Sequence, residues 1–187
     1  MVTEADERGG GSGPASVWLI DGGRIRLAAA SKEELASVAE ILDEASAWLE
    51  ARGFPQWPRP FPVALLETDL ANGIAYLAWD GSTPVGTFAL HRTDPTFWGE
   101  LPAEPPGHAQ YLHKLAVRRR NRGLGRALVD LAVVIARASG ASCLRLDCIA
   151  DNPGLRRYYE DQGFEHRGDL HVPALIGRTS LYEKRLG

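Results

Sequence analysis

Residues 111–127 read YLHKLAVRRRNRGLGRA and contain a strand, a turn and the start of a helix. Residues 111–117 are rich in good strand formers, with apolar side chains on both faces towards the end. Five polar residues follow, and then come Gly123 and Gly125. After the glycines, apolar residues recur at spacings of four and three, as on a helix with one buried face. They are Leu124, Leu128, Leu131, Ile135 and Ala138.

A strand, a glycine turn and a helix in this order suit the binding of an anion. The first turn of a helix has unsatisfied N–H donors and a partial positive charge, and glycines let a phosphate approach the backbone. Several cations surround the same point, namely Arg118, Arg119, Arg120, Arg122 and Arg126. The stretch therefore indicates a cradle for a pyrophosphate. An ordinary strand-to-helix turn with solvated arginines is the alternative interpretation.

The spacing of the glycines narrows the kind of pyrophosphate. The P-loop needs four residues between its glycines and then Gly-Lys-Ser/Thr, which this turn lacks. The dinucleotide fingerprint needs a third glycine where Leu128 stands. The pattern Arg120-x-x-Gly123-x-Gly125 after a strand resembles the acyl-CoA signature of the GNAT N-acyltransferase superfamily, Gln/Arg-x-x-Gly-x-Gly/Ala.

A second stretch carries the same resemblance. Residues 152–164 read NPGLRRYYEDQGF, which is similar to the superfamily's Asn…Tyr-Glu-x-x-Gly-Phe pattern. The two stretches occur in the family order, separated by one predicted helix and one predicted strand. The resemblance extends over about residues 24–186, although only these two stretches are specific. On both together, the chain is identified as a member of the GNAT superfamily.

The resemblance implies a mixed α/β (α+β) GNAT fold. Its sheet would be mostly antiparallel, with about seven strands, about four flanking helices, and central strands that splay apart at Leu115–Val117 and Cys143–Ile149. The implied activity is direct transfer of an acetyl group from the cosubstrate acetyl-CoA to a primary amine of a small molecule or peptide, without a metal. A non-catalytic acyl-CoA-binding or sensing domain of the same fold is the alternative.

The resemblance also implies which residues contact the cosubstrate. Pantetheine would pair with the strand backbone at Leu115–Val117, and the pyrophosphate would lie on the N–H groups of residues 122–127. The implied cosubstrate-binding residues are Leu115, Ala116, Val117, Arg120, Arg122, Gly123, Leu124, Gly125, Arg126, Ala127, Asn152 and Tyr159. Asn152 can equally be a plain helix cap.

Tyr159 matches the family tyrosine that protonates the sulfur of CoA. A phenol with a pKa near 10 holds its proton at neutral pH and can donate it to a thiolate. Register with Gly163 and Phe164 favours Tyr159 over its neighbour Tyr158. A packed, structural tyrosine is the alternative.

The general base is less clearly marked, because the central strand lacks the glutamate that the family often uses. A two-residue period places Tyr111, His113, Leu115 and Val117 on one face of that strand. His113 is thus the candidate base, since an imidazole with a pKa near 6.5 can accept the proton of an ammonium. A structural histidine, Glu67 or Glu100 as the base, and no base at all remain alternatives.

Two proline-rich loops carry aromatic side chains. In residues 54–62, Trp57 and Phe61 are expected to line the acceptor pocket, or merely to pin the loop onto the core. Residues 92–107 form a long connection that suits a ligand or a homodimer contact.

Composition and net charge limit the number of domains and the kinds of partner. The 187 residues, with 44% hydrophobic residues and a net charge of -3, predict one ordinary globular domain without nucleic-acid or membrane partners. Residues 1–16 are expected to be a flexible tail, and 17–187 a single N-acetyltransferase domain. Cys143 and Cys148 lie on opposite faces of one predicted strand, so they do not readily bridge each other. Two such thiols and the lack of a hydrophobic signal region predict a cytoplasmic protein.

Overall fold

The structure is a computed structural model. It describes residues 3–5, 17–20, 24–72, 74–99, 105, 107–121, 123–171 and 177–187. Its contacts divide the chain into two compact units. Unit 1 comprises residues 1–45, 59–89 and 114–128, and unit 2 comprises residues 46–58, 90–113 and 129–187. Boundaries between the units fall within two helices and two strands.

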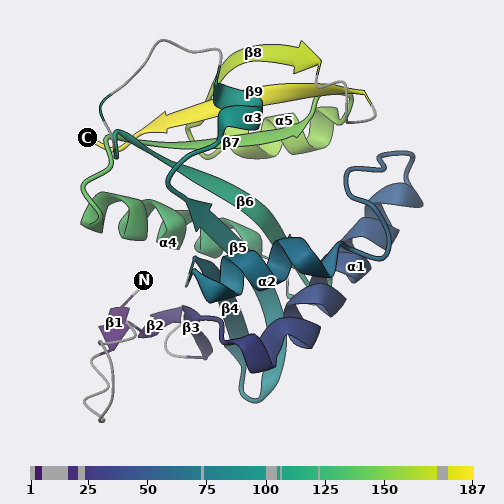
Figure 1. The fold of residues 1–187 in the computed structure, drawn as a ribbon, viewed down its shortest axis with the longest axis vertical. Coiled ribbons are helices and arrows are strands. Elements are labelled where there is room, and N and C mark those ends of the chain that lie inside the picture. Colours follow the sequence, from purple (N-terminus) through teal and green to yellow (C-terminus); the bar gives the residue numbers. More distant parts are fainter. Residues whose placement is uncertain are drawn as a thin grey trace. The chain divides into compact units, whose positions relative to one another are not determined.

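The described residues form nine strands and five α-helices (Figure 1). The strands are β1 Thr3–Ala5, β2 Val17–Ile20, β3 Ile25–Ala29, β4 Ala75–Asp80, β5 Thr83–His91, β6 Ala109–Val117, β7 Cys143–Ile149, β8 Glu165–His171 and β9 Arg178–Arg185. The helices are α1 Leu35–Glu50, α2 Val63–Ala71, α3 Pro95–Trp98, α4 Leu124–Ala138 and α5 Pro153–Glu160, with a 3-10 turn at Lys32–Glu34.

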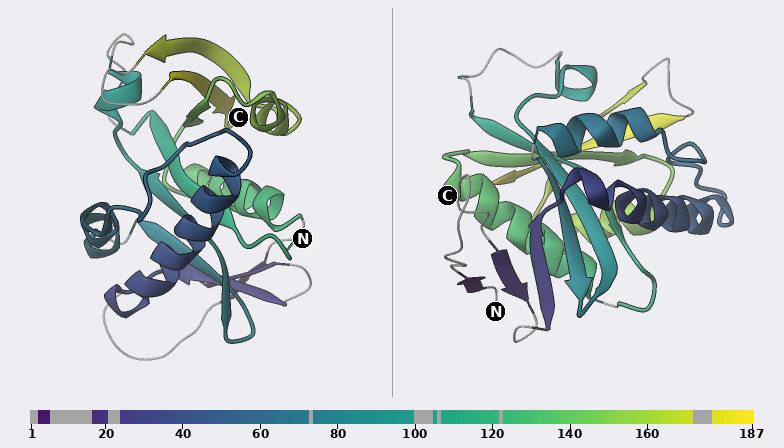
Figure 2. Two further views of the ribbon diagram at one scale, coloured as in Figure 1. Left: turned by 90° about the vertical axis from the view of Figure 1, so that its right-hand side faces the viewer. Right: turned by 60° about the horizontal axis from the view of Figure 1, so that its bottom comes forward.

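Unit 1 is an antiparallel arrangement in the order β1-β2-β3-β4-β5. Its strands β4 and β5 contain runs of consecutive buried residues, and Leu27, Leu77 and Phe88 are fully buried. The right-hand view of Figure 2 shows the long β4–β5 hairpin of this unit. The 3-10 turn before α1 begins with a capping box, in which the Ser31 N–H donates to Glu34 Oε2 at 2.8 Å.

Unit 2 has the strand order β6-β7-β9-β8. β6 and β7 are parallel, and the other pairs are antiparallel. In Figure 2, α3 and α5 lie on opposite sides of these strands. Side chains of β7 therefore reach two environments in turn: Arg145 and Asp147 face the side of α3, and Cys148 faces the side of α5.

The predicted fold class is confirmed, with differences in detail. The sheet is open, mixed and mostly antiparallel, but there are nine strands instead of about seven and five helices instead of about four. Two short elements account for part of the difference. β1 lies in the segment predicted as a flexible tail, whose remaining residues fall outside those described, and α3 lies in the long 92–107 connection. A four-residue helix has too few turns to show a hydrophobic period.

The parallel ladder between β6 and β7 ends at the pair Leu112 and Leu146. β6 and β7 thus stop pairing before β7 ends at Ile149, although β7 stays paired with β9 up to Ile149. The predicted splay also involves Leu115–Val117, which belongs to unit 1, and for those residues it stays a prediction. Within the described part of the chain, no helix combines the length and the hydrophobicity that a bilayer crossing requires.

Candidate active site

The glycine turn lies in unit 1 and has the predicted backbone. Gly123 adopts a φ of 82°, a left-handed value that favours glycine, and α4 begins at the next residue. Within the turn, the Leu124 N–H donates to Asn121 O at 3.2 Å and the Ala127 N–H to Gly123 O at 3.3 Å. The N–H of Gly125 has no acceptor among the described residues. It lies in the first turn of α4, where N–H groups can bind an anion.

The arginines near this turn do not all point to the same place. Arg118 is committed to other partners, because it pairs with Glu44 Oε2 at 2.7 Å and Glu40 Oε2 at 3.3 Å and donates to Pro84 O. Arg120 and Arg126 are exposed. Arg122, predicted to supply both a backbone N–H and a cation, lies outside the described residues.

The strand before the turn is less regular than the sequence predicted. Lys114 adopts a left-handed φ of 55°, and its Nζ pairs with the buried Asp69 at 2.6 Å. The buried residues of β6 are Ala109, Leu112 and Ala116, which do not follow a two-residue period. The period that placed Leu115 and Val117 on the face of His113 therefore does not hold through the strand. A left-handed residue shifts the alternation that an extended backbone would keep.

Tyr159 lies in unit 2 on α5. Asn152 starts that helix, since its Oδ1 accepts from the Leu155 N–H at 3.0 Å, so the structure gives it the helix-cap role. The Tyr159 side chain is buried against Phe164 and Tyr182, at ring-centroid distances of 5.8 and 6.2 Å. Burial raises its pKa well above the usual value, and the charges of nearby groups add to the effect. Its hydroxyl has no hydrogen-bond partner among the described residues, so a proton stays available there.

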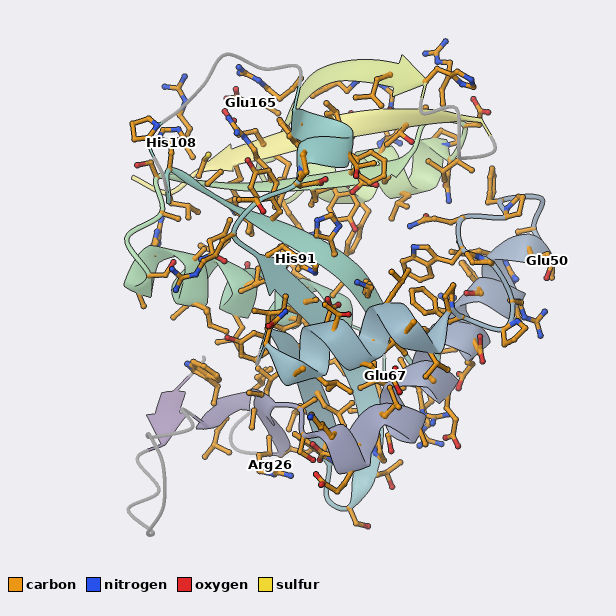
Figure 3. All side chains as sticks on the ribbon, in the orientation of Figure 1. Arg26, Glu50, Glu67, His91, His108 and Glu165 are labelled. Carbon is orange, nitrogen blue, oxygen red and sulfur yellow. The ribbon has the colours of Figure 1, made fainter. Side chains whose placement is uncertain are left out.

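His113 lies at the end of the β6–β7 ladder, between two carboxyl groups. Its Nε2 is 3.4 Å from Asp94 Oδ2, and its Nδ1 is 3.6 Å from Asp147 Oδ1. His91, which Figure 3 labels at the end of β5, lies edge-on to it with ring centroids 4.7 Å apart. We call Asp94, His113 and Asp147 the carboxylate–imidazole cluster.

Asp94 belongs to the start of α3, where it is the N-cap. Its Oδ1 accepts from the Phe97 N–H at 3.2 Å, and its buried Oδ2 has no hydrogen-bond partner among the described residues. At the end of α3, Trp98 lies over the Arg145 guanidinium at 4.7 Å. Arg145 is itself paired with Glu183 at 2.8 Å, so each of these two charges is neutralised by the other.

Asp147 has a perturbed carboxyl group. Its pKa is raised to about 6, chiefly by burial; the charge of His113 lowers the pKa and that of Asp94 raises it within this net value. By contrast, burial raises the pKa of the Cys148 thiol to about 12, which keeps that sulfur unreactive.

The other candidate site residues from the sequence belong to both units. Phe61 is only 4% exposed and its N–H donates to Asp43 at 2.8 Å, as expected if it pins its loop to the core of unit 1. Trp57, in unit 2, is half-buried. Glu67, labelled in Figure 3, is exposed on α2, and Glu100 lies outside the described residues.

Sequence reasoning missed Asp94 and Asp147. Asp94 had a local signal, because an Asp followed by Pro95 is typical of a helix start. Asp147 had none, because only the parallel register that pairs Leu112 with Leu146 brings the next residues, His113 and Asp147, side by side.

These features define the class of the protein. An open mixed sheet with a glycine turn before a helix, and a tyrosine on the helix after the next strand, is the architecture of a GNAT-type acetyltransferase. The sequence profile of the acetyltransferase (GNAT) family matches residues 39–164, and the chain belongs to this family.

Individual relatives agree with this assignment. The chain is 27% identical over 147 residues to the uncharacterized N-acetyltransferase YesJ of Bacillus subtilis (strain 168), covering 73% of this chain and 79% of that protein. A GNAT-family acetyltransferase of Listeria monocytogenes has a similar fold, with a TM-score of 0.73 at 23% identity over 90% of this chain and 99% of that one. YncA of Salmonella typhimurium, a structure with its cofactor acetyl-CoA, has a TM-score of 0.62 at 16% identity, covering 88% and 95% of the two chains.

Proposed function

We propose that the protein is an acetyl-CoA-dependent N-acetyltransferase that transfers the acetyl group directly to a primary amine. The observation that carries the proposal is the arrangement at the end of the β6–β7 ladder in unit 2. Tyr159, which holds its proton, lies on the α5 side, and the carboxylate–imidazole cluster lies on the α3 side. An amine that attacks a carbonyl needs a base on its own side and an acid at the leaving group.

The residues of the glycine turn fit the cosubstrate. The left-handed Gly123 and the first turn of α4 place backbone N–H groups where a pyrophosphate can approach them, and Arg120 and Arg126 nearby in the sequence are exposed. We assign pantetheine binding to the backbone of Leu115–Val117. Bound there, acetyl-CoA would supply an acyl group activated as a thioester. Arg122, Leu124 and Ala127 complete the proposed turn.

Tyr159 is the proposed acid. Because its pKa is raised, the phenol is protonated over the whole physiological range, and it can donate to a sulfur that gains negative charge. His113, between Asp94 and Asp147, belongs to the proposed base for the amine. Trp57 remains a proposed acceptor contact, whereas the burial of Phe61 favours a role in holding the loop.

A domain that only binds acyl-CoA is the weaker candidate. The argument for it was that the central strand lacks a carboxylate, and Asp94 and Asp147 now supply two carboxyl groups beside His113. A cytoplasmic location is proposed as well, since both cysteines are free thiols.

The experiment is a thiol-release assay with acetyl-CoA and a panel of amines: polyamines, aminoglycosides, amino acids and peptide N-termini. We expect amine-dependent release of CoA with at least one class, and an acetylated amine of the expected mass. Binding of acetyl-CoA without release in the presence of any amine would favour the binding domain instead.

A further inference from the structure

We infer that Asp147 is the residue that meets the acceptor's ammonium group and takes its proton, with His113 and Asp94 behind it as a relay. The acceptor is accordingly an aliphatic amine that arrives as a cation. The inference rests on the proposed function and assigns a base that neither sequence motif contains.

The exposure of the three side chains gives the order in which a ligand from solvent would reach them. Asp94 is the innermost, with a side chain 6% exposed, whereas those of His113 and Asp147 are 17% and 20% exposed. A ligand approaching from solvent therefore reaches Asp147 or His113 before Asp94. Asp94 is also held in place, because its Oδ1 is fixed by the Phe97 N–H while Oδ2 faces the His113 ring.

The two carboxyl groups face different nitrogens of one imidazole, which suits proton transfer. In the tautomer with the proton on Nε2, the nitrogen nearer Asp94, Nδ1 carries the lone pair on the side of Asp147. Although the three residues could offer ligand atoms within 4.8 Å of one another, a metal ion would use only one ring nitrogen. The separations of 3.4 and 3.6 Å are slightly long, as is common before a substrate closes a catalytic site.

The charges around Asp147 come from several elements. His113 on β6 and Asp94 before α3 face it, with His91 of β5 against the His113 ring. Cys148 and Tyr159, whose pKa values are raised, are uncharged neighbours. Arg145 is paired with Glu183 and is not available to neutralise Asp147. With a pKa of about 6, Asp147 is ionised at pH 7–8 and attracts a cation.

The proton balance is simple. An N–H bond of the ammonium breaks and an O–H bond forms on Asp147, which leaves a neutral amine with a free electron pair. The proton then passes from Asp147 Oδ1 to His113 Nδ1, giving an imidazolium between two carboxylates. The neutral amine can now form its bond to the acyl carbon as the carbon–sulfur bond breaks, and the leaving sulfur receives a proton from the Tyr159 hydroxyl. The amide nitrogen loses its second proton as it forms, and this proton restores the Tyr159 phenol through solvent. The relay returns its proton to solvent.

The test compares two kinds of acceptor in the full-length enzyme: the best aliphatic amine of the panel and an aromatic amine, which is neutral at pH 7. Asp147→Asn should lower kcat/KM for the aliphatic amine about 10²–10⁴-fold and remove the rise of kcat/KM through pH 6. It should lower the value for the aromatic amine far less. Asp94→Asn keeps an oxygen for the Phe97 N–H, so a smaller fall and a displaced pH limb are expected.

Asp130→Asn, on the exposed side of α4, is the matched control and should behave as the wild type. Equal losses for both acceptors in Asp147→Asn, with acetyl-CoA binding unchanged in calorimetry, would overturn the inference, as would a wild-type pH profile. So would activity that is lost with a chelator and restored by a divalent cation. Wild-type enzyme inactive on every amine would instead refute the proposed function.

Discussion

Tyr159 combines a buried ring with a hydroxyl that has no hydrogen-bond partner among the described residues. A hydroxyl that no described residue engages keeps a donor available to a ligand. Tyr158 is its neighbour, with ring centroids 5.2 Å apart, and is only half-buried. The pair provides a natural comparison.

Tyr159→Phe should lower kcat by about 10²–10⁴-fold and leave the affinity for acetyl-CoA nearly unchanged. Phenylalanine keeps the packing against Phe164 and Tyr182 and removes only the proton donor. Steady-state kinetics with calorimetry of acetyl-CoA binding would measure both quantities, and Tyr158→Phe should be nearly silent. A Tyr159→Phe protein with wild-type kcat would exclude the acid role.

The raised pKa of Asp147 also predicts that the stability of the protein depends on pH. Its folded-state pKa, about 6, lies above the usual value of 3.8, so the folded protein binds more protons than the unfolded chain between these values. The free energy of unfolding should therefore fall as the pH rises through that window. Asp147→Asn should be more stable than the wild type by about 2 kcal/mol at pH 8, with little difference at pH 4. Urea unfolding at both pH values measures this, and a difference independent of pH would contradict it.

Which residues could be predicted from sequence depends on how far apart their partners lie. Tyr159, Asn152 and the two glycines stand in short motifs, and their local roles follow from the turn or helix that contains them. Asp147 becomes informative only beside His113, which is 34 positions earlier in the chain. No local pattern contains that pairing.

Among the elements, β5 comes close to β6 and to the start of α4 at Gly86, which the sequence did not reveal. A Cβ built on Gly86 would lie 2.9 Å from Leu128 Cδ1, 3.2 Å from Val117 Cγ1 and 3.3 Å from Ala116 O. All four residues belong to unit 1, so Gly86 lets the strand, β6 and the first turns of α4 pack together. Glycine is otherwise unfavourable inside a strand, which makes its presence here informative.

Gly86→Ala should destabilise the protein by about 1–3 kcal/mol, because its neighbours must shift to admit a methyl group. Gly154→Ala is the matched control, since its nearest neighbour would be Asn152 Oδ1 at an ordinary 3.5 Å. Replacing glycine by alanine within α5 should be neutral or stabilising. Thermal melts of both variants would measure these changes in stability. Equal melting temperatures of the two variants would show that the contact at Gly86 relaxes without cost.

At the scale of the whole molecule, sequence patterns located nearly every long element. The strand Cys143–Ile149 has the predicted bounds, and the helix predicted after the glycines begins at Leu124, because its apolar residues recur at spacings of four and three. The misses are short or non-local: α3, β1, the left-handed Lys114 and the cluster at the end of the β6–β7 ladder. Tertiary contacts decide those features.

Binding of acetyl-CoA by the glycine turn should stabilise the folded chain as a whole. A ligand at about 100 times its Kd adds about 2.7 kcal/mol to the free energy of unfolding, or about 5–10 °C in Tm for a chain of this size. Acetyl-pantetheine, which lacks the pyrophosphate, should give little shift, because the backbone donors at the start of α4 would have no anion to bind.

Gly125→Val tests the same point from the protein side, since a branched side chain in the first turn of α4 blocks the approach of a phosphate. Its own Tm without ligand serves as the reference, and the shift with acetyl-CoA should disappear. If the variant keeps the full shift, or if acetyl-pantetheine stabilises the wild type as well as acetyl-CoA does, the turn is not where the pyrophosphate binds. The arginines around it would then be ordinary solvated side chains.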